Sequence, residues 1–138
     1  MNNLVTHTIE PFCPPDARIL ILGTIPSPKS REFGFYYGHP QNRFWRVLSD
    51  ILNQPRPETN EEKKDFLKRN NIALWDVLAS CNIDGASDSS IKNPVPNDFT
   101  EVLGRGKIKA VFTTGAKATA LYKKYCYPTT GVPSILLP

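Results

Sequence analysis

Short apolar runs alternate with amphipathic segments along this chain, and the alternation predicts a parallel sheet covered by helices. The clearest run is the apolar centre Ile19 to Leu22, which Gly23 follows directly. A short run that is apolar on both faces is typical of a central parallel strand. Runs of the same character recur, so the pattern predicts four strands over residues 17–24, 72–79, 108–113 and 133–137.

The segments between these runs predict helices. Residues 41–53 carry apolar side chains at helical spacing, so Phe44 and Trp45 are expected in the core. Good helix formers and capping residues predict three more helices, over 60–71, 98–103 and 116–125, with Asn60 and Asn97 as N-caps. Strands that alternate with helices indicate a three-layer α/β/α fold around a four-stranded parallel sheet, as one domain over residues 1–138.

Two long polar segments follow the first two predicted strands, at residues 25–40 and 80–97. They have no periodicity, and loops of this length are usually either functional or disordered. In open α/β sheets, functional groups gather beyond the carboxyl ends of the strands, which is where both segments begin. The chain stops at Pro138, directly after an apolar strand, so we expect it to be truncated relative to a longer domain.

Composition narrows the class of protein. An apolar fraction of 40% and a charged fraction of 22% are typical of a soluble globular protein. No apolar run approaches the roughly 20 residues of a membrane span, and the N-terminus lacks the features of a signal peptide. The three cysteines are far apart and match no disulfide framework or zinc site. We therefore expect a cytoplasmic protein with reduced, packed thiols, no metal and no membrane contact.

A net charge of +4 permits an anionic partner such as nucleic acid, although charge alone does not establish one. The first polar segment has the side chains for such a partner. Its basic and hydroxyl residues suit phosphates, and its aromatic residues suit stacking on a base. The candidates for phosphate contact are Ser27, Lys29, Ser30 and Arg31, and the candidate for stacking on a base is Tyr36 or Tyr37. The alternatives are that the aromatic residues cover the loop's own small core and that His39, before a proline, is a turn residue.

The second polar segment places Ser80 and Asn82 just after a predicted strand, where they are candidates for hydrogen bonds to the edge of a base. Ordinary turn residues are the alternative for both. Asp76, inside that strand, is interpreted as a hydrogen-bonded structural carboxylate. The chain contains no GxxxxGK[ST], GxSxG or HExxH motif, which argues against the familiar nucleotide, serine-hydrolase and zinc-protease sites.

Three segments together resemble the hypoxanthine (deoxyinosine) branch of the uracil-DNA glycosylase superfamily. They are GTIPSPKS at 23–30, YYGHPQNRFW at 36–45 and ALWDVLASCNIDGASDSSIKN at 73–93, and the likeness extends over residues 18–138. The resemblance implies a four-stranded parallel sheet and a pocket for a flipped base. It also implies hydrolysis of the N-glycosidic bond of deaminated bases, hypoxanthine or uracil, without metal or cofactor.

The resemblance assigns roles within the first segment. Gly23, Thr24, Ile25 and Pro26 match a loop that reads Gly-x-Asp-Pro or Gly-x-Asn-Pro across the superfamily, in which the third residue positions water. Ile25 stands at that position, and an alkyl group cannot hold water. The branch is expected to use the Asn of its HPxN segment instead. The implied catalytic residues are therefore Asn42 and His39, and the implied substrate contacts are Gly23, Thr24, Ile25, Pro26, Ser27, Tyr36, Tyr37, Ser80 and Asn82.

The sequence thus predicts a monomeric, monofunctional DNA glycosylase of base excision repair, with DNA containing deaminated bases as its partner. Family members carry a second motif after the last strand, where this chain ends, so we expect weakened catalysis. A non-catalytic nucleic-acid-binding module is the main alternative. A small-molecule hydrolase on the same fold is another.

Overall fold

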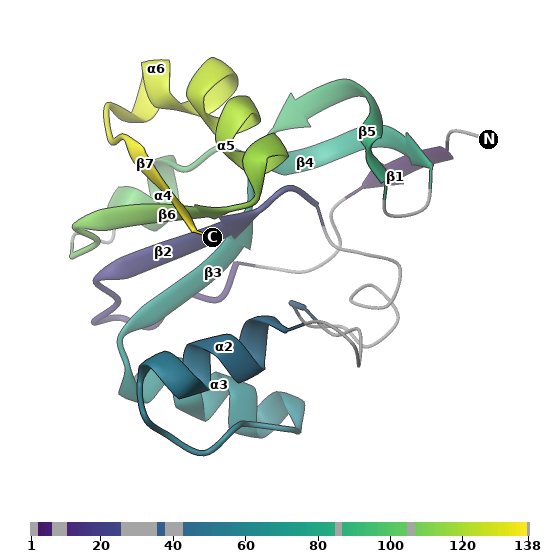
Figure 1. Cartoon of the computed structure of the whole chain (residues 1–138). Coiled ribbons are helices and arrows are strands. Elements are labelled where there is room, and N and C mark those ends of the chain that lie inside the picture. The colour runs from purple at the N-terminus through teal and green to yellow at the C-terminus, as the bar shows by residue number, and fades with distance from the viewer. Residues whose placement is uncertain are drawn as a thin grey trace.

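Two sheets organise the chain, as a computed structural model shows (Figure 1). The structure describes residues 3–6, 11–25, 36–37, 43–84, 87–104 and 107–137. One sheet has four parallel strands in the order β3-β2-β6-β7. These strands are β2 (Ile19–Gly23), β3 (Ile72–Asp76), β6 (Ala110–Thr114) and β7 (Ser134–Leu137). The predicted four-stranded parallel sheet is therefore confirmed.

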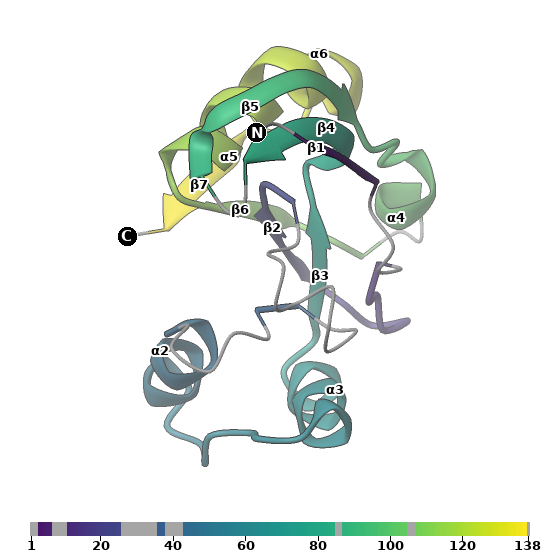
Figure 2. The ribbon, with the colours of Figure 1, turned by 90° about the vertical axis from the view of Figure 1, so that its right-hand side faces the viewer.

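Helices cover both faces of the parallel sheet, and Figures 1 and 2 agree on their sides. One face carries α2 (Phe44–Ile51) and α3 (Asn60–Arg69). The other carries α4 (Thr100–Gly104), α5 (Ala116–Leu121), a π-helix η1 (Tyr122–Cys126) and α6 (Tyr127–Thr130). The predicted helix over 116–125 thus changes its hydrogen-bond register at Tyr122 and continues to Thr130. This arrangement confirms the three-layer prediction.

Alternate residues of β2 feed two hydrophobic cores, because successive side chains of a strand point to opposite faces. Leu20 and Leu22 join the core against α4 and α5. Ile21 joins the core against α2 and α3, together with Trp45 and Phe66. Trp45 is 3% exposed, so its predicted core position is confirmed. The sheet is consequently fixed from both sides, and its carboxyl-terminal edge is held in place.

The predicted loop at residues 80–97 is wrong. It forms β4 (Leu78–Asp84) and β5 (Ser87–Pro96), which build a three-stranded antiparallel sheet with β1 (Asn3–Thr6) in the order β1-β4-β5. The pairing of β4 with β5 has register shifts, which destroy the alternation of polar and apolar residues that would announce strands. Pro94 and Pro96 are tolerated because β5 is an edge strand.

Two of the predicted helix caps are also wrong. Thr59, not Asn60, caps α3: its side chain accepts a hydrogen bond from the Glu62 N–H, and the Glu62 side chain accepts one from the Thr59 N–H. This reciprocal capping box stabilises the helix by about 1 kcal/mol. The Asn97 side chain donates instead to the Asp76 carbonyl oxygen at 2.9 Å, and α4 begins only at Thr100.

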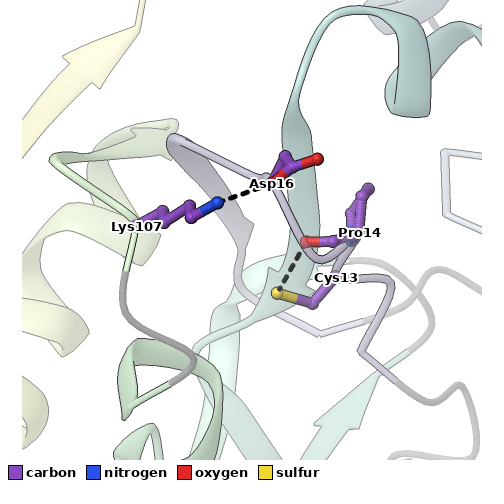
Figure 3. Close-up of polar contacts among 4 residues, drawn as sticks. All are labelled: Cys13, Pro14, Asp16 and Lys107. Atoms are coloured by element: carbon purple, nitrogen blue, oxygen red, sulfur yellow. Dashed lines mark hydrogen bonds and ion pairs between the residues drawn. The ribbon is translucent and has the colours of Figure 1, made fainter.

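An exposed ion pair lies at the amino-terminal end of the parallel sheet (Figure 3). Lys107, before β6, contacts the Asp16 carboxylate, before β2, at 2.8 Å, and this hydrogen bond lowers the pKa of Asp16. Nearby, the Cys13 thiol faces the Pro14 carbonyl oxygen at 3.8 Å. Both side chains of the ion pair are largely exposed, so it contributes little to stability. This end of the sheet is opposite to the carboxyl ends of its strands.

The other two cysteines serve packing. Cys81 is completely buried and Cys126 is 3% exposed, and both belong to the larger core. Burial raises the pKa of the Cys126 thiol to about 11, so it carries no thiolate at neutral pH. Within the residues that the structure describes, no helix is long and apolar enough to cross a membrane.

Candidate active site at the carboxyl ends of the parallel strands

Three side-chain oxygens converge beside Gly23, the last residue of β2. Gly23 pairs with Asp76 at the end of β3, and Thr114 ends the neighbouring strand β6. A Cβ atom on Gly23 would lie 2.5 Å from Asp76 Oδ1, 3.3 Å from Tyr37 Oη and 3.6 Å from Thr114 Oγ1. Glycine therefore provides the space into which these oxygens fit. We call Gly23, Tyr37, Asp76 and Thr114 the edge cluster.

The edge cluster lies where open α/β sheets place their ligands. The chain runs from β2 to β3 on one side and then crosses to β6 on the other side of β2. The connections that leave these strands therefore diverge, and the crevice between their carboxyl ends is the usual ligand site of such sheets. The edge cluster thus lies at the usual position of a ligand site, and its carboxylate is buried, since Asp76 is 3% exposed.

Tyr37 is held in one orientation by its neighbours. Its hydroxyl oxygen lies 3.4 Å from Thr114 Oγ1, which itself donates to the Leu22 carbonyl oxygen at 3.2 Å. Because Thr114 has a single hydroxyl proton, the Tyr37 hydroxyl is the donor between the two. The Tyr37 ring stacks on Phe44 with centroids 3.9 Å apart, and its backbone is left-handed, with φ of 53°. Such backbone conformations persist only where the surroundings impose them.

The Tyr37 hydroxyl is a neutral hydrogen-bond donor. Its ring is partly exposed, but protein surrounds its hydroxyl end, and this burial raises the pKa of Tyr37 far above its usual value. The negative charge of Asp76 raises the pKa further, whereas the hydrogen bond to Thr114 lowers it. Tyr37 therefore cannot act as a base at neutral pH, and its single hydroxyl proton is donated to Thr114.

The raised pKa makes stability sensitive to alkaline pH. An unfolded tyrosine loses its proton near pH 10. Folded Tyr37 keeps its proton at that pH. The contribution of Tyr37 to the free energy of unfolding is therefore complete below about pH 10, and it is lost as the pH rises from there toward the higher pKa of the folded state. We expect wild type to be more stable than Tyr37→Phe at pH 8, and this advantage to shrink by pH 11. Urea unfolding at both pH values measures it.

Tyr127→Phe is the matched control, because Tyr127 is 41% exposed. It should leave the alkaline loss of stability at its wild-type size. An advantage of wild type over Tyr37→Phe that stayed constant from pH 8 to pH 11 would contradict the assignment.

A cavity of about 560 Å³ borders the edge cluster on the side of α2. Its polar lining residues are Tyr37, Arg43 and Thr114, and apolar side chains of the sheet and α2 line the remainder. This volume is in the usual range for small-molecule pockets. The aliphatic part offers no partners for a base edge, so the end at Tyr37 and Thr114 is the part suited to a polar ring.

Gly23, Thr24, Ile25 and Tyr37 lie at this edge, whereas Tyr36 lies in the core. Thr24 is 8% exposed, and its carbonyl oxygen accepts the Leu78 N–H at 3.0 Å. Ile25 packs against the larger core. Tyr36 is 2% exposed, and its carbonyl oxygen accepts the Trp45 indole N–H at 3.2 Å. Of the two tyrosines named for stacking, Tyr37 borders the cavity and Tyr36 has no ring face open to a base.

Ser80 and Asn82 lie on β4, in the antiparallel sheet, and not in a loop. Asn82 accepts a hydrogen bond from the Asn93 side chain at 3.0 Å and pairs with Lys92 in register. Ser80 pairs with Val95 in register. Their predicted contact with a base stays a prediction.

Several predicted site residues fall outside the residues that the structure describes. They are Pro26, Ser27, Lys29, Ser30, Arg31, His39 and Asn42. The described neighbour of Asn42 is Arg43, which directly precedes α2 and lines the cavity. The roles of Asn42 and His39 therefore remain expectations from the sequence.

Two members of the edge cluster were not named as substrate contacts by sequence reasoning. Asp76 was interpreted as a structural carboxylate, and the complete hydrogen bonding of buried side chains among the described residues agrees with that interpretation. Its carboxylate lies beside Gly23 at the edge cluster. The sequence pattern does not identify Thr114 as a site residue. The available signal was that each is polar and stands near the end of a predicted strand.

The described residues contain no group of three His, Cys, Asp or Glu side chains arranged to hold a metal ion. Within the described part of the chain, the side chains nearest to Gly23 are one carboxylate and two hydroxyls. They form a hydrogen-bonding site with both donors and an acceptor.

Comparison with known proteins agrees with this architecture. The family model described as the uracil DNA glycosylase superfamily matches residues 10–136, nearly the whole chain. The chain belongs to the uracil DNA glycosylase superfamily. The resemblance found in the sequence is thereby confirmed.

The chain is also similar to individual proteins and to a solved structure. A Methanosarcina barkeri protein named hypoxanthine DNA glycosylase is 36% identical over 110 residues, which are 78% of this chain and 70% of that protein. A Methanosarcina acetivorans protein of the same name is 35% identical over 124 residues, covering 86% and 78% of the two chains. An NMR structure of a M. acetivorans protein proposed to be a uracil DNA glycosylase superposes with a TM-score of 0.80 at 28% identity. It covers 99% of this chain and 84% of that one.

Proposed function

We propose that this member of the superfamily is a DNA glycosylase that hydrolyses the N-glycosidic bond of deaminated bases, hypoxanthine first and uracil second. The observation that carries the proposal is the 36% and 35% identity to two proteins named hypoxanthine DNA glycosylase. Such an enzyme acts in base excision repair by moving the target base out of the duplex into a pocket. The crevice at the edge cluster is the place for that pocket.

The chemistry of the edge cluster supports deaminated bases as the substrate class. Deamination turns the ring acceptor N1 of adenine or N3 of cytosine into an N–H donor in hypoxanthine or uracil. The Asp76 carboxylate offers acceptor oxygens to such a donor. The same carboxylate faces an acceptor lone pair when adenine or cytosine occupies the pocket, which disfavours these normal bases.

Water is the proposed nucleophile, and Asn42 the residue that orients it. Cleavage of the N-glycosidic bond develops positive charge on the sugar and negative charge on the departing base. A neutral amide orients water by hydrogen bonds without carrying a charge, and His39 stands three residues away in the same segment. The Arg43 side chain, which lines the cavity, supplies donors near the departing base. The proposed enzyme is monofunctional and monomeric.

Single-turnover assays with the full chain in excess over labelled duplexes test the function. Duplexes with one inosine, one uracil or only normal bases are incubated, and the resulting abasic sites are cleaved with alkali. We expect cleavage at inosine, slower cleavage at uracil and none in the normal duplex. Trapping with borohydride should yield no covalent complex, because water and not a lysine attacks the sugar. Binding without release from any duplex would instead favour a non-catalytic nucleic-acid-binding module.

A further inference from the structure

A groove of about 520 Å³ runs between β5 and the helical segment formed by α5 and η1. Lys92 and Asn93 line it from β5, and Lys117 and Lys124 line it from the helical segment. The Lys124 ammonium group lies 5.1 Å from the centre of the Tyr125 ring, which also lines the groove. Three lysines from two separate elements thus face one channel. We call them the groove lysines.

The described lining of the groove carries no negative charge. Among the residues that the structure describes there, none is an Asp or Glu. Among the described residues, the ion pairs involve Lys64 with Glu61 and Lys107 with Asp16, and not the groove lysines. Three ammonium groups without a carboxylate partner create a positive potential in a concave surface, where the protein focuses the field.

The chain concentrates its positive charge around this region. Residues 102–138 contain six Lys and Arg and no Asp or Glu, whereas residues 1–101 contain 11 Lys and Arg against 13 Asp and Glu. The excess of positive charge therefore comes from the segment that holds β6, α5 and η1. The opposite face, with α3, mixes both signs.

Short stretches of the chain connect the elements that line the groove to residues of the edge cluster. Thr114 of the cluster is followed by Gly115 and then by α5, which carries Lys117. Asp76 is separated by one residue from β4, whose Asn82 pairs with Lys92 on β5. In Figures 1 and 2, β5 arches beside α5 on the face of the sheet opposite α2 and α3. The groove is therefore built on elements that follow the carboxyl ends of the parallel strands, where the base is expected to enter.

We propose that the groove lysines bind the phosphate backbone of the DNA strand next to the flipped base. The inference rests on the proposed function for the choice of DNA as the polyanion. Lysine ammonium groups suit phosphates as mobile point charges, and they position the strand without reading its sequence. The groove thereby supplies affinity and register, while the edge cluster contacts the base.

The salt dependence of DNA binding tests this inference. The full chain is titrated against a fluorescein-labelled duplex of normal bases, followed by anisotropy at several salt concentrations. Each lost phosphate contact reduces the slope of log Kobs against log salt by about 0.9. The variant Lys92→Gln, Lys117→Gln, Lys124→Gln should therefore lower the slope by about 2 to 3 and bind about tenfold more weakly, or worse, at low salt.

The variant Lys64→Gln, Lys68→Gln, Arg69→Gln is the matched control. It removes the same charge from α3, on the opposite face of the sheet (Figure 1). Its slope should stay at the wild-type value, and thermal unfolding verifies that both variants fold. An unchanged slope in the groove variant, or an equal loss in the α3 variant, would overturn the inference.

Base release distinguishes this inference from the proposed function. If the wild type cleaves the inosine duplex and the groove variant keeps the wild-type slope, the groove assignment fails and the function stands. If the wild type cleaves no duplex but the groove variant loses slope, the glycosylase activity fails and the phosphate contact stands.

Discussion

Replacing Asn42 by alanine is expected to slow the release of hypoxanthine from an inosine-containing duplex by about 100- to 1,000-fold. The superfamily's usual water-positioning residue is replaced here by Ile25, which packs against the core and has no polar group. Asn42 is the residue proposed to orient water, so removal of its amide leaves only the contributions of His39, of binding and of electrostatic effects. The rate constant in single-turnover assays at saturating enzyme reports this step directly.

Gln41→Ala is the control for Asn42→Ala, because it removes an amide from the adjacent position of the same segment. We expect it to cleave at nearly the wild-type rate. Asn42→Ala should still bind the undamaged duplex with wild-type affinity, since the amide acts on water and not on phosphates. Cleavage by Asn42→Ala as fast as by wild type would show that another group orients the water.

Gly23→Ala is expected to destabilise the protein by about 1–3 kcal/mol and to abolish most base release. The new methyl group would lie 2.5 Å from Asp76 Oδ1, which requires either β2 or the Asp76 side chain to move. Either movement distorts the crevice in which the base is expected to bind. Urea unfolding gives the change in stability, and single-turnover cleavage of the inosine duplex gives the change in activity.

A double-mutant cycle tests whether the collision with Asp76 causes the loss of stability in Gly23→Ala. In an Asp76→Ala background the oxygen that collides is absent, so Gly23→Ala should then destabilise the protein much less than in wild type. Gly104→Ala is the control, because a Cβ there meets nothing within 4 Å. Additive effects of Gly23→Ala and Asp76→Ala would mean that the crowding at Gly23 has another source.

The sequence predicts the parallel sheet well because its strands are short runs with apolar centres and distinct ends. It predicts the edge cluster poorly because strand order is a long-range property. Thr114 approaches Gly23 only because β6 lies beside β2, and no local pattern announces that neighbour. The sequence does not predict the hairpin of β4 and β5 for a different reason. Its register shifts disrupt the alternation of polar and apolar residues that is typical of strands. Likewise, adjacent aromatic residues do not reveal that Tyr36 is buried whereas Tyr37 borders the cavity.

The hydroxyl relay from Tyr37 through Thr114 to Leu22 has a consequence for the order of folding. It joins residues that are 77 and 92 positions apart in the chain. Contacts of such long range require closure of large loops, which makes them slow to form. During synthesis, the pocket wall is therefore completed only after β6 has been made and has docked against β2. A nascent chain that has reached only the first sequence motif carries the motif but lacks the pocket.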